Sequence, residues 1–397
     1  MHVNMNNGLP LEQHPASWIE LSEQALRRNI HYLKRRIGKR ARFCSVIKGN
    51  AYGHGTMQFI DIAERAGVDF FAVFDAYEAE QALQARRDTS DIMVMGMMDH
   101  SAVTWAVEKG ISFYVFDADR METAIRSAKA CGRPARIHLE LETGLNRTGL
   151  EGDELDKVCD LVKRHPDQVE LMGMCTHFAG AESIANYRRI NNQMERYRLL
   201  VEMLASRELV PAFKHTACSA AALTIPESIM DMVRFGIAQY GFWPSKETRM
   251  HNLLSVETSF KKNPLHRVIS WKSRVMGLKK VSAGNFVSYG TSYLTPRDEI
   301  LAVIPVGYAH GFSRSMSNRG HMLIRGKRAP VVGMVNMNMA MVDVTDIIGV
   351  EPGDEVVMIG KQGRHEVSVS AFTDLTQNVN YETLTRLPAE IPRVIVE

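Results

Sequence analysis

Short apolar runs alternate with longer amphipathic stretches between residues 43 and 241. The runs have the length and the Val, Ile and Phe content of buried parallel strands, and helix-like segments such as 76–86, 120–130, 153–164 and 186–206 follow them. Eight such alternations over about 200 residues predict a (β/α)8 barrel. The predicted strands are 43–48, 70–74, 92–96, 113–117, 136–142, 171–178, 213–219 and 232–240.

The pattern changes after about residue 257. Long helical periods give way to short β-branched runs separated by Gly, Pro and Asn, including 268–275, 299–306, 322–325, 340–344 and 355–359. We therefore predict an α/β barrel domain over residues 14–250 and a mainly β domain over 258–397. The polar segment 246–264 is the predicted linker.

Composition is that of an ordinary globular protein, with 45% hydrophobic and 23% charged residues and a net charge of +3. The sequence has no dense stripe of Lys and Arg of the kind that binds nucleic acid. No apolar run reaches the ~20 residues that span a bilayer. The N-terminus has no apolar core of a secretory signal, and the five scattered cysteines fit free thiols. We expect a cytoplasmic protein that binds neither nucleic acid nor membrane.

Polar residues gather at the predicted carboxyl ends of the barrel strands, where barrel enzymes place their chemistry. The first of these is Lys48, which ends an apolar run and opens the segment Lys-Gly-Asn-Ala-Tyr-Gly-His-Gly. A lysine there can bind an aldehyde cofactor as a Schiff base, and glycines let the backbone approach a phosphate. Taken alone, Lys48 is more simply a surface lysine before a turn, and Arg234 a structural ion-pair residue.

Four segments together resemble the alanine racemase family. Residues 48–55 differ only at Gly49 from the family's Lys-Ala-Asn-Ala-Tyr-Gly-His-Gly, and Val-Arg-Phe-Gly at 233–236 is similar to its Val-Arg-Xaa-Gly motif. Residues 215–221 and 287–293 are similar to two further family strings, His-Xaa-Ala-Asn-Ser-Ala-Ala and Val-Ser-Tyr-Gly-Xaa-Thr/Ser-Tyr. The resemblance covers nearly the whole chain.

The resemblance implies a pyridoxal 5′-phosphate (PLP) enzyme that interconverts L- and D-alanine, the latter for peptidoglycan synthesis. Lys48 would carry the cofactor and act as one base, and Tyr289 of a partner subunit would act as the other, so a homodimer with composite sites is expected. His177 and Arg234 are implied as residues that support the tyrosine, and Arg234 also as the partner of the cofactor's ring nitrogen, which then stays unprotonated.

The remaining site residues are carried over from the same resemblance. Arg147 and the backbone of Met337 are implied to bind the substrate carboxylate, and Tyr381 to narrow the entry. The implied cofactor-binding residues are Lys48, Tyr52, His177, Ser219, Arg234, Gly236, Ile237 and Tyr308.

Besides Gly49, four positions depart from the family pattern. Glu140 stands where many members have a carbamylated lysine, and its carboxylate can offer Arg147 a negative charge without carbon dioxide. Cys218 replaces an asparagine, Met334 an arginine and Asn338 an aspartate. The change at Asn338 resembles racemases with a broader substrate range.

Other functions remain open from the residues alone. Cys175, His177, His215 and Cys218 could form a zinc site, but their spacing is looser than in most structural zinc sites, and we expect no metal. A basic amino-acid decarboxylase shares the predicted architecture, although its cysteine-bearing C-terminal motif is not evident. A non-catalytic PLP-binding protein is the third alternative, but such proteins resemble the barrel alone.

Overall fold

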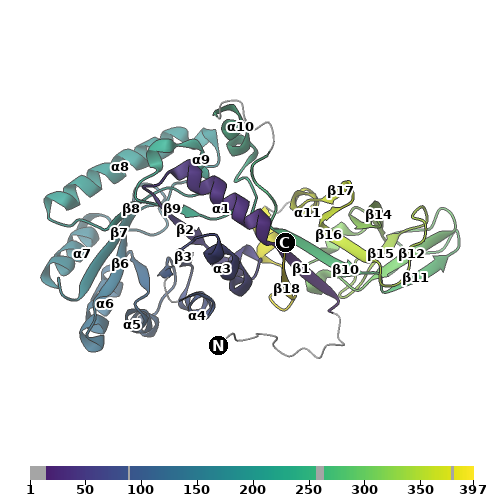
Figure 1. Cartoon of the computed structure of the whole chain (residues 1–397), viewed down its shortest axis with the longest axis horizontal. Coiled ribbons are helices and arrows are strands. Elements are labelled where there is room, and N and C mark those ends of the chain that lie inside the picture. Colours follow the sequence, from purple (N-terminus) through teal and green to yellow (C-terminus); the bar gives the residue numbers. More distant parts are fainter. Residues whose placement is uncertain (1–14, 88–89, 256–262, 377–379) are drawn as a thin grey trace. The chain divides into compact units, whose positions relative to one another are not determined.

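The structure, a computed structural model, describes residues 15–87, 90–255, 263–376 and 380–397. The chain divides into two compact units, each built on its own sheet (Figure 1). We call Glu23–Tyr52 with Thr56–Val268 the barrel unit. The β unit consists of the described residues among 15–22, Gly53–Gly55 and Ile269–Glu397.

Eight parallel strands form the sheet of the barrel unit, in the order β8-β7-β6-β5-β4-β3-β2-β9. The seam between β8 and β9 is closed by Arg234 N–H, which donates to the Ala217 carbonyl at 3.0 Å, and by Asp231 N–H, which donates to the Lys214 carbonyl at 3.0 Å. The predicted eight-stranded barrel is confirmed. Its strands are β2 (Arg42–Val46), β3 (Phe70–Val73), β4 (Asp91–Val94), β5 (Ser112–Val115), β6 (Ala135–Glu140), β7 (Val169–Cys175), β8 (Phe213–His215) and β9 (Met232–Phe235).

Three consecutive barrel helices begin in the same way, which explains their sharp starts. Asp75, Asp99 and Asp117 each accept a hydrogen bond from the N–H three residues later, at the starts of α4, α5 and α6. The helices of this unit are α1 (Glu23–Ile37), α3 (Thr56–Arg65), α4 (Ala76–Ala85), α5 (His100–Lys109), α6 (Ala118–Cys131), α7 (Gly152–Arg164), α8 (Tyr187–Ser206), α9 (Ser219–Thr224) and α10 (Lys246–Ser255), with the short turns α2 (Lys48–Tyr52), η1 (Ile184–Asn186) and η2 (Pro226–Ser228).

Several barrel strands end earlier than the apolar runs predicted. The run 171–178 gives a strand that ends at Cys175, and the run 232–240 gives one that ends at Phe235. Beyond these points the backbone bonds to side chains rather than to a neighbouring strand. For example, Gly236 N–H donates to the Ser219 hydroxyl at 3.0 Å. An apolar run therefore marked both the strand and the loop that follows it.

The predicted linker 246–264 is wrong for its first half, because Lys246–Ser255 forms helix α10. Ser245 caps this helix by accepting from Thr248 N–H at 3.0 Å, and the buried Asn252 accepts from Tyr32 at 2.7 Å. The polar residues that suggested a linker are the residues that attach the helix to the barrel unit. Residues 256–262 lie outside the described chain.

The β unit contains a mostly antiparallel sheet in the order β11-β12-β15-β14-β13-β16-β10-β1-β18, with β17 paired to β16. Trp271, Phe312 and Phe372 pack together in its core, with ring centroids 5.6–6.5 Å apart. The elements are β1 (Ser17–Ser22), β10 (Ile269–Arg274), β11 (Gly277–Val281), β12 (Glu299–Ile304), η3 (Tyr308–His310), η4 (Arg314–Met316), β13 (His321–Ile324), β14 (Lys327–Val332), β15 (Ala340–Asp343), β16 (Glu355–Gln362), β17 (His365–Val367), α11 (Val369–Thr376), α12 (Asn380–Thr385) and β18 (Arg393–Val396).

The first strand of the chain belongs to this sheet, although the sequence analysis counted its residues with the barrel domain. Strand β1 lies between β10, to which it is antiparallel, and β18, to which it is parallel. Its residues alternate between buried and half-buried, which is typical of a sheet with one covered face. That alternation distinguishes β1 from the fully buried strands of the barrel.

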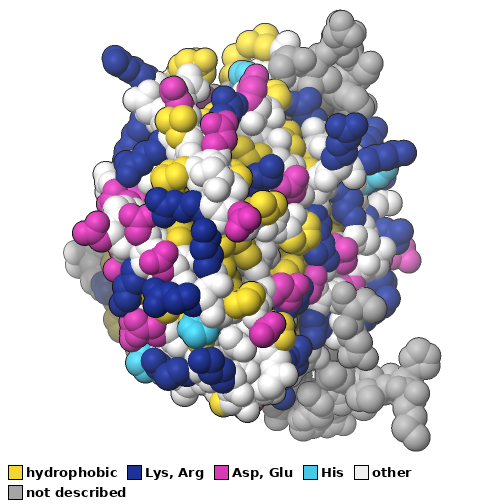
Figure 2. Space-filling model, turned by 90° about the vertical axis from the view of Figure 1, so that its left-hand side faces the viewer, with side chains coloured by type: hydrophobic (Ala, Val, Ile, Leu, Met, Phe, Trp, Pro, Cys, Tyr) yellow, Lys and Arg dark blue, Asp and Glu magenta, His cyan; other side chains and the backbone are white. Residues whose placement is uncertain are grey.

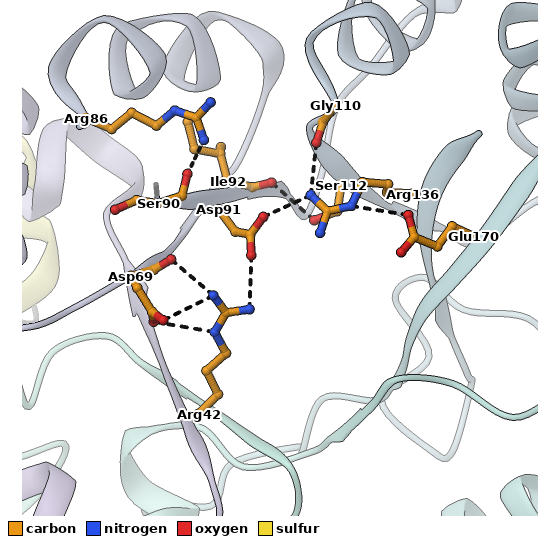
Figure 3. A network of polar contacts seen from close by, with 10 residues as sticks. All are labelled: Arg42, Asp69, Arg86, Ser90, Asp91, Ile92, Gly110, Ser112, Arg136 and Glu170. Carbon is orange, nitrogen blue, oxygen red and sulfur yellow. Dashed lines mark hydrogen bonds and ion pairs between the residues drawn. The ribbon is translucent and has the colours of Figure 1, made fainter. Parts of the chain in front are cut away.

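A network of ion pairs joins the amino-terminal ends of the barrel strands (Figure 3). Asp91 at the start of β4 accepts from Arg42 at 3.0 Å and from Arg136 at 2.9 Å. Arg42 also contacts Asp69 at 3.2 Å, and Arg136 contacts Glu170 at 3.5 Å. This end of a barrel supports stability rather than chemistry. Burial alone raises the pKa of Asp91, but its bonds to Arg136 and the charges of Arg136 and Arg42 outweigh burial and lower it.

Replacing Asp91 by asparagine is expected to destabilise the protein by about 1–2 kcal/mol at pH 7, because both arginines lose a carboxylate that is only 25% exposed. A carboxyl group whose pKa is lowered on folding stabilises the folded state at any pH above its ordinary pKa of about 4. This stabilisation is lost as the pH falls through the lowered pKa of the folded state. Urea midpoints at pH 7 and pH 3 should therefore differ less for D91N than for the unchanged protein. Asp61→Asn, which removes one exposed pair with Arg65, serves as the control and should shift the pH 7 midpoint little.

Candidate active site

Lys48 lies directly after β2, at the carboxyl end of the barrel, and the backbone turns sharply behind it. Residues 49–52 all have left-handed dihedrals, with φ between +51° and +64°. A left-handed conformation costs a non-glycine residue roughly 1–2 kcal/mol, so three such residues in succession mark a strained turn. Asn50 helps to hold it by accepting from Thr56 N–H at 2.9 Å. The strain lies next to the residue that the sequence singled out for chemistry.

The surroundings of Lys48 favour its neutral amine. Its pKa is lowered, first because the surrounding protein displaces water from the ammonium group and second because the positive charge of Arg147 is near; the charge of Glu78 opposes both. The Glu78 carboxylate accepts from the N–H groups of Gly49 at 2.5 Å and Phe74 at 2.8 Å. Sequence reasoning missed Glu78, although its place three residues after the capping Asp75 put it at the start of a helix.

Tyr52, Gly236 and Ser219 meet behind the lysine. A Cβ atom on Gly236 would lie 2.6 Å from the Tyr52 hydroxyl, so any side chain at that position would displace Tyr52. The buried Ser219 hydroxyl accepts from Gly236 N–H at 3.0 Å and from Ala238 N–H at 3.4 Å. The buried Ile237 lies between these two donors in sequence. The structure thus brings together four of the predicted cofactor-binding residues.

Arg234 is buried, and its guanidinium is held by hydrogen bonds from three sides. One terminal nitrogen contacts the ring and the carbonyl of His215 at 2.5 and 2.8 Å. The other donates to the carbonyls of Thr176 at 2.7 Å and Thr216 at 3.1 Å. The neutral oxygens and ring nitrogen around it leave the charge of Arg234 in place while fixing its orientation.

A second buried histidine extends this arrangement, and sequence reasoning did not single it out. His138 Nδ1 lies 3.0 Å from His215 Nε2. Because arginine can only donate, His215 must accept at Nδ1 and donate from Nε2 to His138. Burial lowers the pKa of His138 to about 3 and that of His215 well below its usual value, so both rings are neutral. The alternation of Arg136, His138 and Glu140 along β6 was the signal that could have identified it.

Arg147 lies on the loop 141–150, which returns to β6 and is fixed by a buried carboxylate. Glu142 accepts from the N–H groups of Gly144 and Asn146, the latter at 2.9 Å. Nearby, Glu140 accepts from the Thr148 hydroxyl at 2.8 Å. Burial raises the pKa of Glu140; the Thr148 hydrogen bond and the charges of Arg147 and Arg234 lower it in part, so the net shift is upward.

His177 follows β7 and is a neutral imidazole near neutral pH. Burial, together with the positive charges of Arg234, Arg147 and Lys48, lowers its pKa to about 3. His177 is therefore near the lysine and both arginines of the predicted site. Within the described residues, no group of three or more His, Cys, Asp or Glu side chains is arranged to hold a metal ion.

The other predicted site residues belong to the β unit. Tyr289 is 73% exposed and follows Ser288, whose φ is +66° and whose hydroxyl bonds to the Met334 carbonyl and the Asn336 side chain at 2.9 and 3.1 Å. In the loop that contains Asn336 and Met337, the Asn336 carbonyl accepts from Tyr308 N–H and the Met337 carbonyl accepts from Ala309 N–H. Tyr289, Tyr308 and Met337 are thus attached to one set of loops, and Tyr381 lies on α12.

Comparison with known proteins matches the chain to two family models. The family model for the alanine racemase N-terminal domain matches residues 21–244, and that for the alanine racemase C-terminal domain matches residues 268–395. The chain belongs to the alanine racemase family. The first match covers the barrel strands and the second covers most of the β unit.

Individual relatives of the family match along almost the whole chain. An alanine racemase of Symbiobacterium thermophilum is 37% identical over 380 residues, which are 95% of this chain and 96% of the relative. The solved alanine racemase of the D-cycloserine producer Streptomyces lavendulae has 29% identity and a TM-score of 0.87, covering 97% of this chain and 98% of that one. A solved histidine racemase of Leuconostoc mesenteroides has 26% identity and a TM-score of 0.86, covering 97% and 99%.

The exposed surface of this family member is of mixed charge where Figure 2 shows it. Lys and Arg side chains are interspersed there with Asp and Glu side chains. Such mixing is typical of a solvated surface. Among the helices of the described chain, none is both long enough and apolar enough to cross a membrane.

Proposed function

We propose that this protein is a PLP-dependent racemase that interconverts L- and D-alanine. The observation that carries the proposal is the position of Lys48: at the carboxyl end of a barrel strand, with a lowered pKa, beside the site built by Tyr52, Ser219 and Gly236. A lowered pKa increases the fraction of neutral amine, which is the nucleophilic and basic form.

The residues present fit PLP. The glycine at 236, the hydroxyls of Tyr52 and Ser219 and the backbone of Ile237 form a cradle suited to a phosphate, with Tyr308 assigned to the same group. Arg234, whose terminal nitrogens are already engaged, is assigned to the ring nitrogen of the cofactor. When bound, PLP withdraws electrons and so acidifies the α-proton of the amino acid.

Racemisation needs a base on each face of the substrate's α-carbon. We assign Lys48 to one face and Tyr289 to the other, with His177 as the neutral acceptor that supports the tyrosine. Arg147 and the Met337 backbone are assigned to the substrate carboxylate, since a guanidinium pairs well with a carboxylate.

A homodimer completes the proposal. Tyr289 is strongly exposed in its own unit although Ser288 beside it is fixed by hydrogen bonds, which suits a residue offered to a partner subunit. Tyr381 is assigned to the entry of the composite site. In the same way, we propose a PLP-binding domain over 14–250 and a domain over 258–397 that supplies the second base.

Purified protein reconstituted with PLP tests the function directly. We expect it to interconvert L- and D-alanine, which chiral chromatography of the products measures. A second candidate, a broad-range amino-acid racemase, is favoured by Asn338 and by the similarity to a histidine racemase. A panel of L-amino acids separates the two, since turnover of alanine alone excludes the broad range. A yellow protein without turnover indicates a non-catalytic PLP-binding protein instead.

Replacing Glu140 by glutamine is expected to raise the KM for alanine or lower kcat about tenfold, because Arg147 and Arg234 lose a buried negative charge while Thr148 keeps an acceptor. The raised pKa of Glu140 sets the pH dependence: the difference between the unchanged enzyme and E140Q should be largest at high pH and shrink as Glu140 becomes protonated. Initial rates from pH 5 to pH 9 measure this. Equal kinetics at every pH would contradict the role of Glu140.

A further inference from the structure

One buried side chain joins the loop of Arg147 to the segment of His177. Gln193, on α8, is 1% exposed. Its carbonyl oxygen accepts from Ala179 N–H at 2.8 Å, and its amide nitrogen donates to the His177 carbonyl at 3.0 Å. The side chain therefore pairs with the backbone on both sides of Phe178, as a neighbouring strand would, at the place where β7 has already ended.

The same amide nitrogen also reaches the neighbouring loop. It donates to the Thr143 hydroxyl at 3.3 Å, and that hydroxyl lies 2.7 Å from the hydroxyl of Thr176. Thr143 belongs to the loop 141–150, which carries Arg147. Since the Thr176 carbonyl accepts from Arg234, the backbone of His177 is held from one side by Arg234 and from the other by Gln193.

We propose that Gln193 is a positioning residue that holds His177 and the loop of Arg147 in one fixed arrangement. This role rests on the racemase function proposed above. The amide uses its oxygen as acceptor and its nitrogen as donor, so no side chain that only accepts or only donates can replace it. Small misplacements of groups that meet a substrate can cost about 10²-fold in rate.

Gln193→Glu gives the sharpest test, because the two forms of the new carboxyl group differ by one proton, which supplies the missing donor and removes the negative charge. The ionised form can accept from Ala179 N–H but has no proton to donate to the His177 carbonyl or to Thr143. The protonated form can do both. Burial raises the pKa of such a carboxyl group by several units, which brings its titration toward neutral pH.

The charged groups around this position come from three elements. Glu142, on the loop, accepts from Gly144 N–H, and Arg189, on α8, donates to the Gly144 carbonyl at 2.8 Å. Arg234, on β9, donates to the Thr176 carbonyl at 2.7 Å. His177, which follows β7, is neutral near pH 7. The negative charge of Glu142 and the positive charges of Arg189 and Arg234 partly offset one another, so burial is expected to dominate the pKa of the new group.

The quantity to measure is kcat/KM of each variant divided by kcat/KM of the unchanged enzyme at the same pH. For Q193E we expect this ratio to be at least about tenfold below one at pH 8.5 and to rise severalfold by pH 6. Gln193→Met keeps the volume but removes donor and acceptor, so its ratio should be low and independent of pH. Asn192→Asp makes the same chemical change on the exposed neighbouring residue and should stay near one throughout. A flat ratio for Q193E overturns the proposal.

Hydrogen exchange measured by mass spectrometry on the protein without substrate gives a second readout. Exchange in Q193M should rise in peptides that cover 141–150 and 177–181 and stay unchanged in peptides that cover α4 and α5. A uniform rise over the whole barrel unit would show a merely structural role and would also overturn the proposal. This readout needs no turnover. If the protein without any substitution had no racemase activity, that result would count against the proposed function, and hydrogen exchange would still decide the role of Gln193.

Discussion

Lys48→Ala is expected to lower the rate of alanine racemisation about 10³-fold or more, the largest effect of any single substitution in the chain. The substitution removes the nitrogen proposed to bind the cofactor and, with it, one of the two bases. A positioned acid–base group alone contributes about 10²–10⁴-fold. Turnover of L-alanine and of D-alanine should both be lost, because each direction uses the lysine once.

Three measurements make this prediction specific. Lys109→Ala, on the exposed end of α5, is the matched control and should keep full activity. Borohydride reduction of the unchanged enzyme and peptide mapping should locate a pyridoxyl group on Lys48. Thermal melting should show that K48A is folded, since Lys48 is not part of the apolar core. A pyridoxyl group on another lysine, or near-normal turnover by K48A, would show the assignment to be wrong.

The barrel was predictable because its strands are buried on both faces. A parallel strand enclosed by helices must be apolar throughout, and this leaves an unbroken run such as 70–74 between amphipathic segments. The ends of the strands were less predictable. Beyond Cys175 and Phe235, apolar residues continue in loops whose backbone bonds to Gln193 and Ser219. Such side-chain partners are distant in sequence, and periodicity carries no information about them.

The candidate site was predictable only in part, for a similar reason. Lys48, Arg234 and Tyr289 lie in motifs whose order of residue types is itself informative. His138, Glu142 and Gln193 act by what they contact: a second histidine, two backbone N–H groups and the backbone around Phe178. A single histidine, glutamate or glutamine within a strand or helix pattern has many possible partners. Its role is visible only when the fold has brought the partner to it.

The left-handed turn at residues 49–52 shows the same limit in backbone form. Glycine at 49 suggested a turn, but Asn50, Ala51 and Tyr52 have no intrinsic preference strong enough to predict left-handed dihedrals. The conformation is maintained by the contacts of Asn50 with Thr56 and of Glu78 with Gly49. Strain of this kind is stored where the surrounding structure supports it, and here that place adjoins Lys48.

Tyr289→Phe is expected to lower racemisation about 10²–10⁴-fold while leaving the fold intact, because it removes only a hydroxyl from a side chain that is 73% exposed. The loss should be uneven. With one base gone, a proton can still be removed and returned on the face that Lys48 serves, but none can be delivered to the opposite face. One enantiomer of alanine should therefore exchange its α-proton with deuterated solvent without being converted into the other.

Proton NMR of L-alanine and D-alanine incubated separately in deuterium oxide measures this exchange, and chiral chromatography of the same samples measures conversion. Tyr187→Phe, which removes a hydroxyl from another exposed tyrosine, is the control and should racemise normally. Two outcomes for Y289F would be incompatible with two bases on opposite faces: equal α-proton exchange from both enantiomers, or an equal loss of that exchange from both. Because the proposed tyrosine comes from a partner subunit, mixing Y289F with K48A should restore activity: reassociated dimers that pair one chain of each kind contain one composite site with both bases intact.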